Sequence, residues 1–213
     1  MITKLSKLRA LAEWALKLVS ARTVRIIGGD YSVKGQFPYL VLIQTSGQHH
    51  CGGSIVADQY ILTAAHCLIN DNNIAPYKAY RVVFDSVDLN NYEGFEVDAV
   101  AAYAFSKYDP KKTLNDIAIL KLKQRLPLGG NSVLQKIRLP RSGDSYAGRT
   151  AVISGCGYTS IEVEFDPTTR RKVEGRDSSD NKLKYAYVDL MSNSDCMEKN
   201  NYLIYPGQIC GQV

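Results

Sequence analysis

Short runs in which apolar and polar residues alternate recur from residue 38 onward, and they predict a protein built mainly of β-strands. In the first half of the chain the expected strands are residues 39–43, 53–56, 60–63, 80–84, 95–100 and 117–122. Turn-forming residues such as glycine, asparagine and aspartate lie between them. Many short strands separated by turns are typical of a closed barrel or a sandwich, and no repeat with a period of about 20–50 residues is visible.

A linker at residues 127–140 leads to a second group of strands. These are residues 151–155, residues 184–190 and a strand that begins at residue 208. A long polar insertion, residues 159–183, interrupts this group. Alternation at 161–165, a turn at 166–169 and a return at 170–174 predict a protruding hairpin within the insertion.

The first 25 residues follow a different pattern. Their apolar residues recur at helical spacing, at Leu5, Leu8, Ala12, Ala15, Leu16 and Val19. Charged residues interrupt every apolar run, so the segment has neither the core of a signal peptide nor a membrane span. A weakly basic amphipathic helix describes it best. The residues leave open a helix on a membrane surface, a transit segment or sequence upstream of the true start.

Composition excludes some classes of function. The chain has 213 residues, 45% of them hydrophobic, and a net charge of +5. The length allows one or two compact units, and the mild charge favours solubility over an anionic partner. No basic run is interleaved with aromatic residues, so nothing supports nucleic-acid binding.

Five cysteines in a chain of this size indicate an oxidising compartment. The alternative is a metal site, since several potential ligands lie close in sequence: His49, His50, Cys51, His66 and Cys67. Zinc sites usually contain close ligand pairs such as C-x2-C, and no such pair is present. We therefore expect neither a metal nor another cofactor.

The most specific chemistry lies at residues 62–67, Leu-Thr-Ala-Ala-His-Cys. His66 follows a predicted strand and is a candidate general base, which requires fixed geometry. A lone histidine at this place would be interpreted as a core residue. The surrounding motif makes the catalytic interpretation stronger.

Together with Cys51-Gly-Gly-Ser-Ile, this motif resembles the histidine box of chymotrypsin/trypsin-type serine proteases. Three further motifs follow the order of that family: Arg25-Ile26-Ile27-Gly28-Gly29 resembles its activation site, Asn115-Asp116-Ile117-Ala118-Ile119-Leu120 its aspartate box, and Ser154-Gly155-Cys156-Gly157 its Ser-Gly-Trp-Gly turn. The resemblance covers residues 26–213 and implies an all-β, trypsin-like double six-stranded Greek-key barrel. Residues 26–135 would form a complete first barrel and residues 136–213 an incomplete second one, after a leader or pro-segment at 1–25.

The resemblance also implies roles for individual residues. His66 would be the general base, and the buried carboxylate of Asp116 would orient it. A cut between Arg25 and Ile26 would activate the protein by freeing the Ile26 ammonium. The disulfide pairs would be Cys51–Cys67 and Cys196–Cys210. Cys156, where the family usually has tryptophan, would then be a small buried thiol or would bridge to a segment beyond residue 213.

No serine stands in the Gly-Asp-Ser-Gly-Gly-Pro context that supplies the family's nucleophile, oxyanion hole and specificity pocket. We therefore expect a secreted, zymogen-type serine endopeptidase represented by a C-terminally truncated chain, inactive as it stands. The alternative is a non-catalytic homologue that acts as a binding or regulatory module. The expected partners are peptide or protein substrates and an activating protease that cuts after a basic residue, with no nucleic acid and no membrane span.

Overall fold

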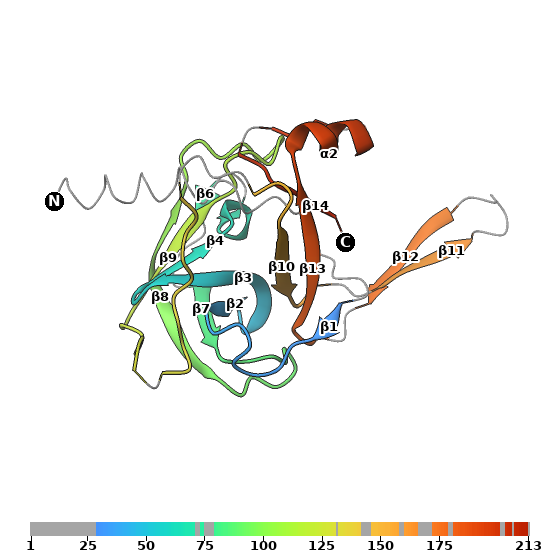
Figure 1. Ribbon diagram of the computed structural model, residues 1–213. Coiled ribbons are helices and arrows are strands. Elements are labelled where there is room, and N and C mark those ends of the chain that lie inside the picture. Colours follow the sequence, from blue (N-terminus) through green and yellow to red (C-terminus); the bar gives the residue numbers. More distant parts are fainter. Residues whose placement is uncertain are drawn as a thin grey trace.

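The computed structural model shows a chain that is mainly β-strand, with little helix (Figure 1). The structure describes residues 29–70, 73–74, 79–130, 132–141, 146–157, 160–165, 172–178, 181–200, 203–205 and 207–212. The predicted leader and the predicted cut between Arg25 and Ile26 lie outside the described residues. Within these ranges, no helix has the length and apolar character needed to cross a membrane.

Six antiparallel strands close into a barrel in the order β2-β3-β4-β9-β8-β7. Their bounds are β2 (Leu40–Thr45), β3 (Gln48–Ala57), β4 (Tyr60–Thr63), β7 (Tyr80–Phe84), β8 (Phe95–Ala104) and β9 (Ala118–Leu122). The predicted six-stranded first barrel is therefore confirmed. β3 begins earlier and β8 ends later than the sequence pattern indicates.

The barrel closes around the apolar residues that alternate along its strands. The largest fully buried side chains of the barrel core include Ile43, Ile55, Ile61, Val82, Phe84, Leu120 and Leu122. Burying a side chain of this size contributes about 1.5–3 kcal/mol. Gly53 of β3 has no room for a side chain, because an added Cβ would lie 2.8 Å from Cγ2 of Ile61. A glycine here lets β3 approach its neighbours closely.

The hairpin between β2 and β3 is tighter than the sequence indicates. Its turn consists of Ser46 and Gly47, both with positive φ (52° and 78°), as in two-residue hairpin turns. Consequently His49 and His50, which lie between the predicted strands 39–43 and 53–56, belong to strand β3. Two shorter elements follow β4: the 3-10 helix η1 (Ala65–Cys67) and the small hairpin of β5 (Ile69–Asn70) and β6 (Asn73–Ile74).

The second half of the chain, together with one short strand from the beginning of the described residues, forms a four-stranded sheet beside the barrel (Figure 1). Strand β13 (Lys184–Met191) is central. It pairs along one edge with β10 (Thr150–Gly155), and elsewhere with β1 (Asp30–Tyr31) and β14 (Cys210–Gln212). In the part of the chain that the structure describes, this sheet is open, so the second barrel stays a prediction.

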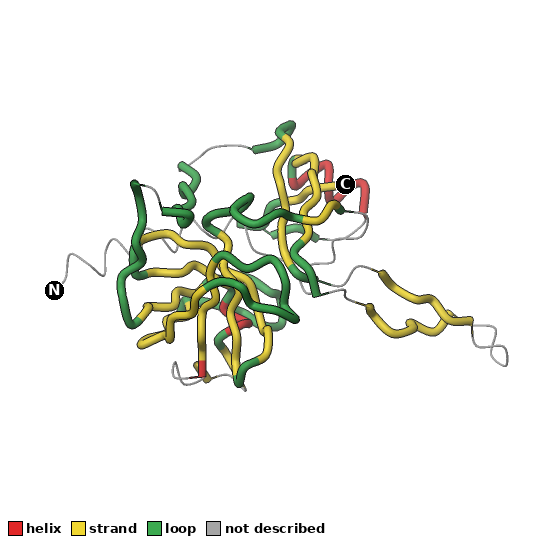
Figure 2. Tube along the Cα trace, turned by 90° about the horizontal axis from the view of Figure 1, so that it is seen from below, coloured by secondary structure: helices red, strands yellow, loops and turns green. Residues whose placement is uncertain are grey.

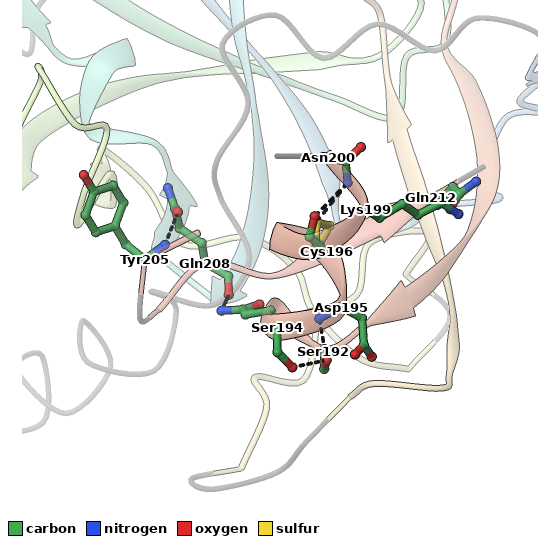
Figure 3. Close-up of a disulfide and its surroundings, with 11 residues drawn as sticks. Ser192, Ser194, Asp195, Cys196, Lys199, Asn200, Tyr205, Gln208 and Gln212 are labelled. Atoms are coloured by element: carbon green, nitrogen blue, oxygen red, sulfur yellow. Dashed lines mark hydrogen bonds between the residues drawn. A yellow bond between two sulfur atoms is a disulfide. The ribbon is translucent and has the colours of Figure 1, made fainter. Parts of the chain in front are cut away.

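A short helix, α2 (Asn193–Asn200), follows β13 and was not predicted from the sequence. The backbone N–H of Asp195 donates to Oγ of Ser192 at 3.1 Å, as at the N-terminus of a capped helix. The pattern Ser-x-x-Asp is the signal that could have revealed it. The disulfide Cys196–Cys210 joins this helix to β14. Lys199 of the helix also contacts Gln212 of β14, and Figure 3 shows these two side chains close to Cys196.

The predicted hairpin of the polar insertion is confirmed. Strands β11 (Ser160–Phe165) and β12 (Lys172–Ser178) pair antiparallel. They project away from both sheets in two views (Figures 1 and 2). Just after the hairpin, the N–H of Leu183 donates to the carbonyl of Val87 at 2.8 Å, and its carbonyl accepts from the N–H of Ser32 at 2.9 Å. The first bond ties the segment before β13 to the loop that follows β7, and the second ties it to the residue after β1.

Candidate active site

The pairing of β4 with β9 brings the two predicted catalytic residues together. The register aligns Thr63 with Ala118, so the end of β4 meets the start of β9. His66 follows β4, and Asp116 precedes β9. Two residues that are 50 positions apart in sequence therefore meet at one end of the barrel.

Two hydrogen bonds join His66 to the carboxylate of Asp116. The backbone N–H of His66 donates to Oδ1 at 2.8 Å, and ring atom Nδ1 lies 2.6 Å from Oδ2. Because a carboxylate that is ionised only accepts, Nδ1 must carry the proton. In the neutral imidazole, Nε2 is then an acceptor, which is the state that a general base requires.

Burial differs sharply between these two side chains. The Asp116 side chain is 0% exposed, whereas the His66 side chain is 44% exposed. A buried carboxylate is tolerated only when its oxygens are hydrogen-bonded, and both oxygens accept from His66. The arrangement therefore holds one edge of the imidazole inside the protein and leaves a large part of the side chain open to solvent.

The segment before Asp116 is held in a tight bend. Asn115 has φ 58°, a conformation that asparagine tolerates better than most residues. Its side-chain amide donates to the carbonyl of Lys107 at 2.7 Å. The N–H of Phe105 donates to the carbonyl of Ile117 at 3.0 Å. These contacts fix the backbone on both sides of the carboxylate.

Strand β3 holds the histidine from the other side. The predicted disulfide Cys51–Cys67 is confirmed, with a Cα–Cα distance of 6.2 Å. The hydroxyl of Thr63 donates to the carbonyl of Gly52 at 2.8 Å. Sγ of Cys67 lies 3.6 Å from Nε2 of His66, so the disulfide lies beside the imidazole.

The same sulfurs argue against a metal centre. Potential ligand atoms of Cys51, His66 and Cys67 lie within 4.8 Å of one another. A metal ion binds cysteine as a thiolate, and sulfurs joined in a disulfide cannot become thiolates. This group of residues therefore does not fit a metal ion.

Two neighbouring histidines in β3 differ in their contacts. Nδ1 of His49 is buried without a hydrogen-bond partner, whereas Nε2 of His50 lies 2.9 Å from the carbonyl oxygen of Cys67. Burial, and secondarily the nearby charge of His50, lowers the pKa of His49 below its usual range. The sequence presents both histidines only as potential metal ligands, and their position next to Cys51 is the signal that could have suggested another role.

The other predicted motifs are the Ser-Gly-Cys-Gly turn at residues 154–157 and the activation site, whose residues Arg25 and Ile26 lie outside the described residues. Ser154 belongs to strand β10, and Cys156 is partly buried and belongs to neither disulfide. Both structural disulfides, including Cys196–Cys210, have the predicted pairing.

Comparisons of the sequence with known proteins identify a family. The family model described as Trypsin matches residues 26–213. Among curated proteins, Trypsin Blo t 3 of Blomia tropicalis is 34% identical over 149 residues, which is 70% of this chain and 53% of that protein. Kallikrein-7 of Homo sapiens is 30% identical over 80% of this chain and 63% of its own length, and Trypsin beta of Drosophila erecta is 31% identical over 81% and 60%.

A solved structure shares the fold. Neuropsin, a serine protease expressed in the limbic system of mouse brain, matches with a TM-score of 0.69 at 21% identity, covering 88% of this chain and 75% of that chain. The present chain spans little more than half the length of the curated relatives it matches.

Proposed function

Because this chain belongs to the trypsin family of serine proteases, we propose that it forms the part of a serine-type endopeptidase that carries the general base and its orienting carboxylate. His66 takes the role of the base and Asp116 that of the orienting group. The substrates are peptide bonds of proteins, as for other members of this family.

One observation supports this proposal above the others, namely the geometry between His66 and Asp116. The 2.6 Å contact between Nδ1 and Oδ2 fixes the ring, and it leaves Nε2 as the atom that can accept a proton. In acyl transfer this atom takes the proton of a serine hydroxyl as the oxygen attacks a carbonyl carbon, and later returns it to the leaving amine. The Asp116 carboxylate stabilises the imidazolium formed in between and remains ionised.

None of the serines in the 213 residues stands in the Gly-Asp-Ser-Gly-Gly context that carries the nucleophile of this family. We propose that the nucleophilic serine is supplied by sequence following residue 213 in the whole protein. The relatives support this, since the chain accounts for only 53–63% of the length of three of them. The 213 residues alone would then be inactive as a peptidase.

We further propose that the protein is a secreted zymogen. Two disulfides suit an oxidising compartment. The motif Arg25-Ile26-Ile27-Gly28-Gly29 supplies a bond that a protease specific for basic residues would cut. The freed ammonium of Ile26 would be the activating group.

The proposal is tested by extending the chain. The transcript is first sequenced beyond the codon for Val213, and the chain is then expressed with and without the added sequence. With the Gly-Asp-Ser-Gly-Gly segment present, and after cleavage at Arg25, a fluorophosphonate should label the protein, and His66→Ala should slow labelling by roughly 10³-fold or more. The 213-residue chain should not be labelled. Independent transcripts that all stop after Val213, or labelling that does not depend on His66, would contradict the proposal.

A further inference from the structure

We infer that His50 is a positioning residue for His66, an inference that rests on the proposed role of His66 as the general base. His50 is an exposed residue of β3, and its Nε2 lies 2.9 Å from the carbonyl oxygen of Cys67, the residue directly after His66. A carbonyl only accepts, so Nε2 of His50 must carry the proton. Both the neutral and the charged imidazole can supply this N–H, so the bond persists in either protonation state.

The turn that carries His66 needs such a contact. Helix η1 has only three residues, and its N-cap residue, Ala64, offers no side-chain hydrogen bond. Its internal bonds run from the N–H of Cys67 to Ala64 at 3.3 Å and from the N–H of Leu68 to Ala65 at 2.9 Å. A 3-10 turn has poorer hydrogen-bond geometry than an α-helix, and its last carbonyls need outside partners. The His50 side chain supplies one for Cys67 from a different strand.

His50 and Cys51 hold the same residue in two different ways. They are consecutive in β3, at a register shift that leaves His50 without a partner in β2, and such a bulge changes the direction of the side chains around it. The disulfide from Cys51 holds the side chain of Cys67, while His50 holds its backbone carbonyl. A disulfide fixes a distance but allows the adjoining peptide plane to rotate. The second anchor restrains that rotation, and with it the orientation of the neighbouring imidazole.

The inference predicts that losing the His50 donor loosens the pair of His66 and Asp116 without unfolding the barrel. The measurement is the rate at which the Nδ1 proton of His66 exchanges with water, followed by NMR on the full chain labelled with ¹⁵N-histidine. The chain contains only three histidines, so assignment is simple. In His50→Phe the exchange should become about fivefold faster, the factor that one ordinary hydrogen bond contributes to a local opening equilibrium.

Matched variants separate positioning from general stability. His50→Gln keeps a side-chain N–H at the distance of Nε2 and should exchange within about twofold of the wild type. His50→Asn carries the same amide on a side chain one carbon shorter, so it should behave like His50→Phe. If His50→Phe does not fold, His50→Asn still tests the loss of the donor. His49→Phe makes the same replacement at a histidine without a bond to Cys67, and should leave the rate unchanged.

The outcomes distinguish this inference from the proposed function. If His50→Phe and His50→Asn exchange as slowly as the wild type, the positioning role is overturned while the pair of His66 and Asp116 stands. Equal acceleration in His50→Gln would also overturn it, because the donor would then not be the cause. If the wild type itself shows no protected Nδ1 proton on His66, both the inference and the proposed function lose their basis.

Discussion

The two disulfides permit a prediction with its own control. They join residues separated by 16 and 14 positions, Cys51–Cys67 and Cys196–Cys210. In the chain-entropy description, closing loops of these sizes contributes about 3 kcal/mol each, and the two values differ by only about 0.1 kcal/mol. Removing either bridge should therefore destabilise the protein by a similar amount, although only the first bridge holds His66.

The test uses the variants Cys51→Ala/Cys67→Ala and Cys196→Ala/Cys210→Ala. Alanine is preferred to serine because Cys67, Cys196 and Cys210 are buried, and a buried hydroxyl would need a new partner. With an m-value of about 2 kcal/mol per molar urea, a loss of about 3 kcal/mol moves the unfolding midpoint by about 1.5 M. Far-UV circular dichroism measures this midpoint in both variants.

The second measurement is again the exchange of the His66 Nδ1 proton. It should accelerate in Cys51→Ala/Cys67→Ala and stay near the wild-type rate in Cys196→Ala/Cys210→Ala. If both variants change the rate equally, His66 responds to overall stability and not to the local bridge. If the first variant leaves the rate unchanged, the disulfide does not hold the imidazole, and the reasoning fails.

Three further predictions follow from the site. In the extended enzyme, Asp116→Asn should lower kcat/KM by roughly 10⁴, as the same change does in a Ser-His-Asp triad, because the wrong tautomer of His66 is then favoured. Cleavage of a fluorogenic peptide measures this loss, and a loss below about tenfold would contradict the orienting role. Because folding lowers the pKa of His49, the unfolded chain binds the proton more readily, so stability should fall as the pH drops below about 6.5. Urea unfolding at several pH values, with His49→Gln as the comparison, should show a shallower pH dependence in the variant; identical slopes would refute it. Brief digestion with a trypsin-like protease should cut after Arg25 and expose Ile26, and N-terminal sequencing checks this; a resistant bond combined with early cuts inside the barrel would count against the zymogen proposal.

The sequence alone predicted most of the first barrel, for a local physical reason. A strand with one buried face must alternate apolar and polar residues, and that period is visible without any knowledge of its partners. The family resemblance also predicted roles for His66 and Asp116 and both disulfide pairs. The pattern of apolar and polar residues did not predict the secondary structure where that pattern was weak or where a neighbouring turn set the structure. His49 and His50 follow a two-residue turn and fall between two predicted strands, and helix α2 is only eight residues long.

The tertiary structure decided what depends on long-range contact. His66 and Asp116 are 50 residues apart, and only the pairing of β4 with β9 shows that the carboxylate reaches Nδ1 and so selects the tautomer. The contact of His50 with the carbonyl of Cys67 likewise spans 17 residues and joins a strand to a separate turn. No periodicity along the chain encodes such contacts, because they arise only when barrel closure brings the ends of different strands together.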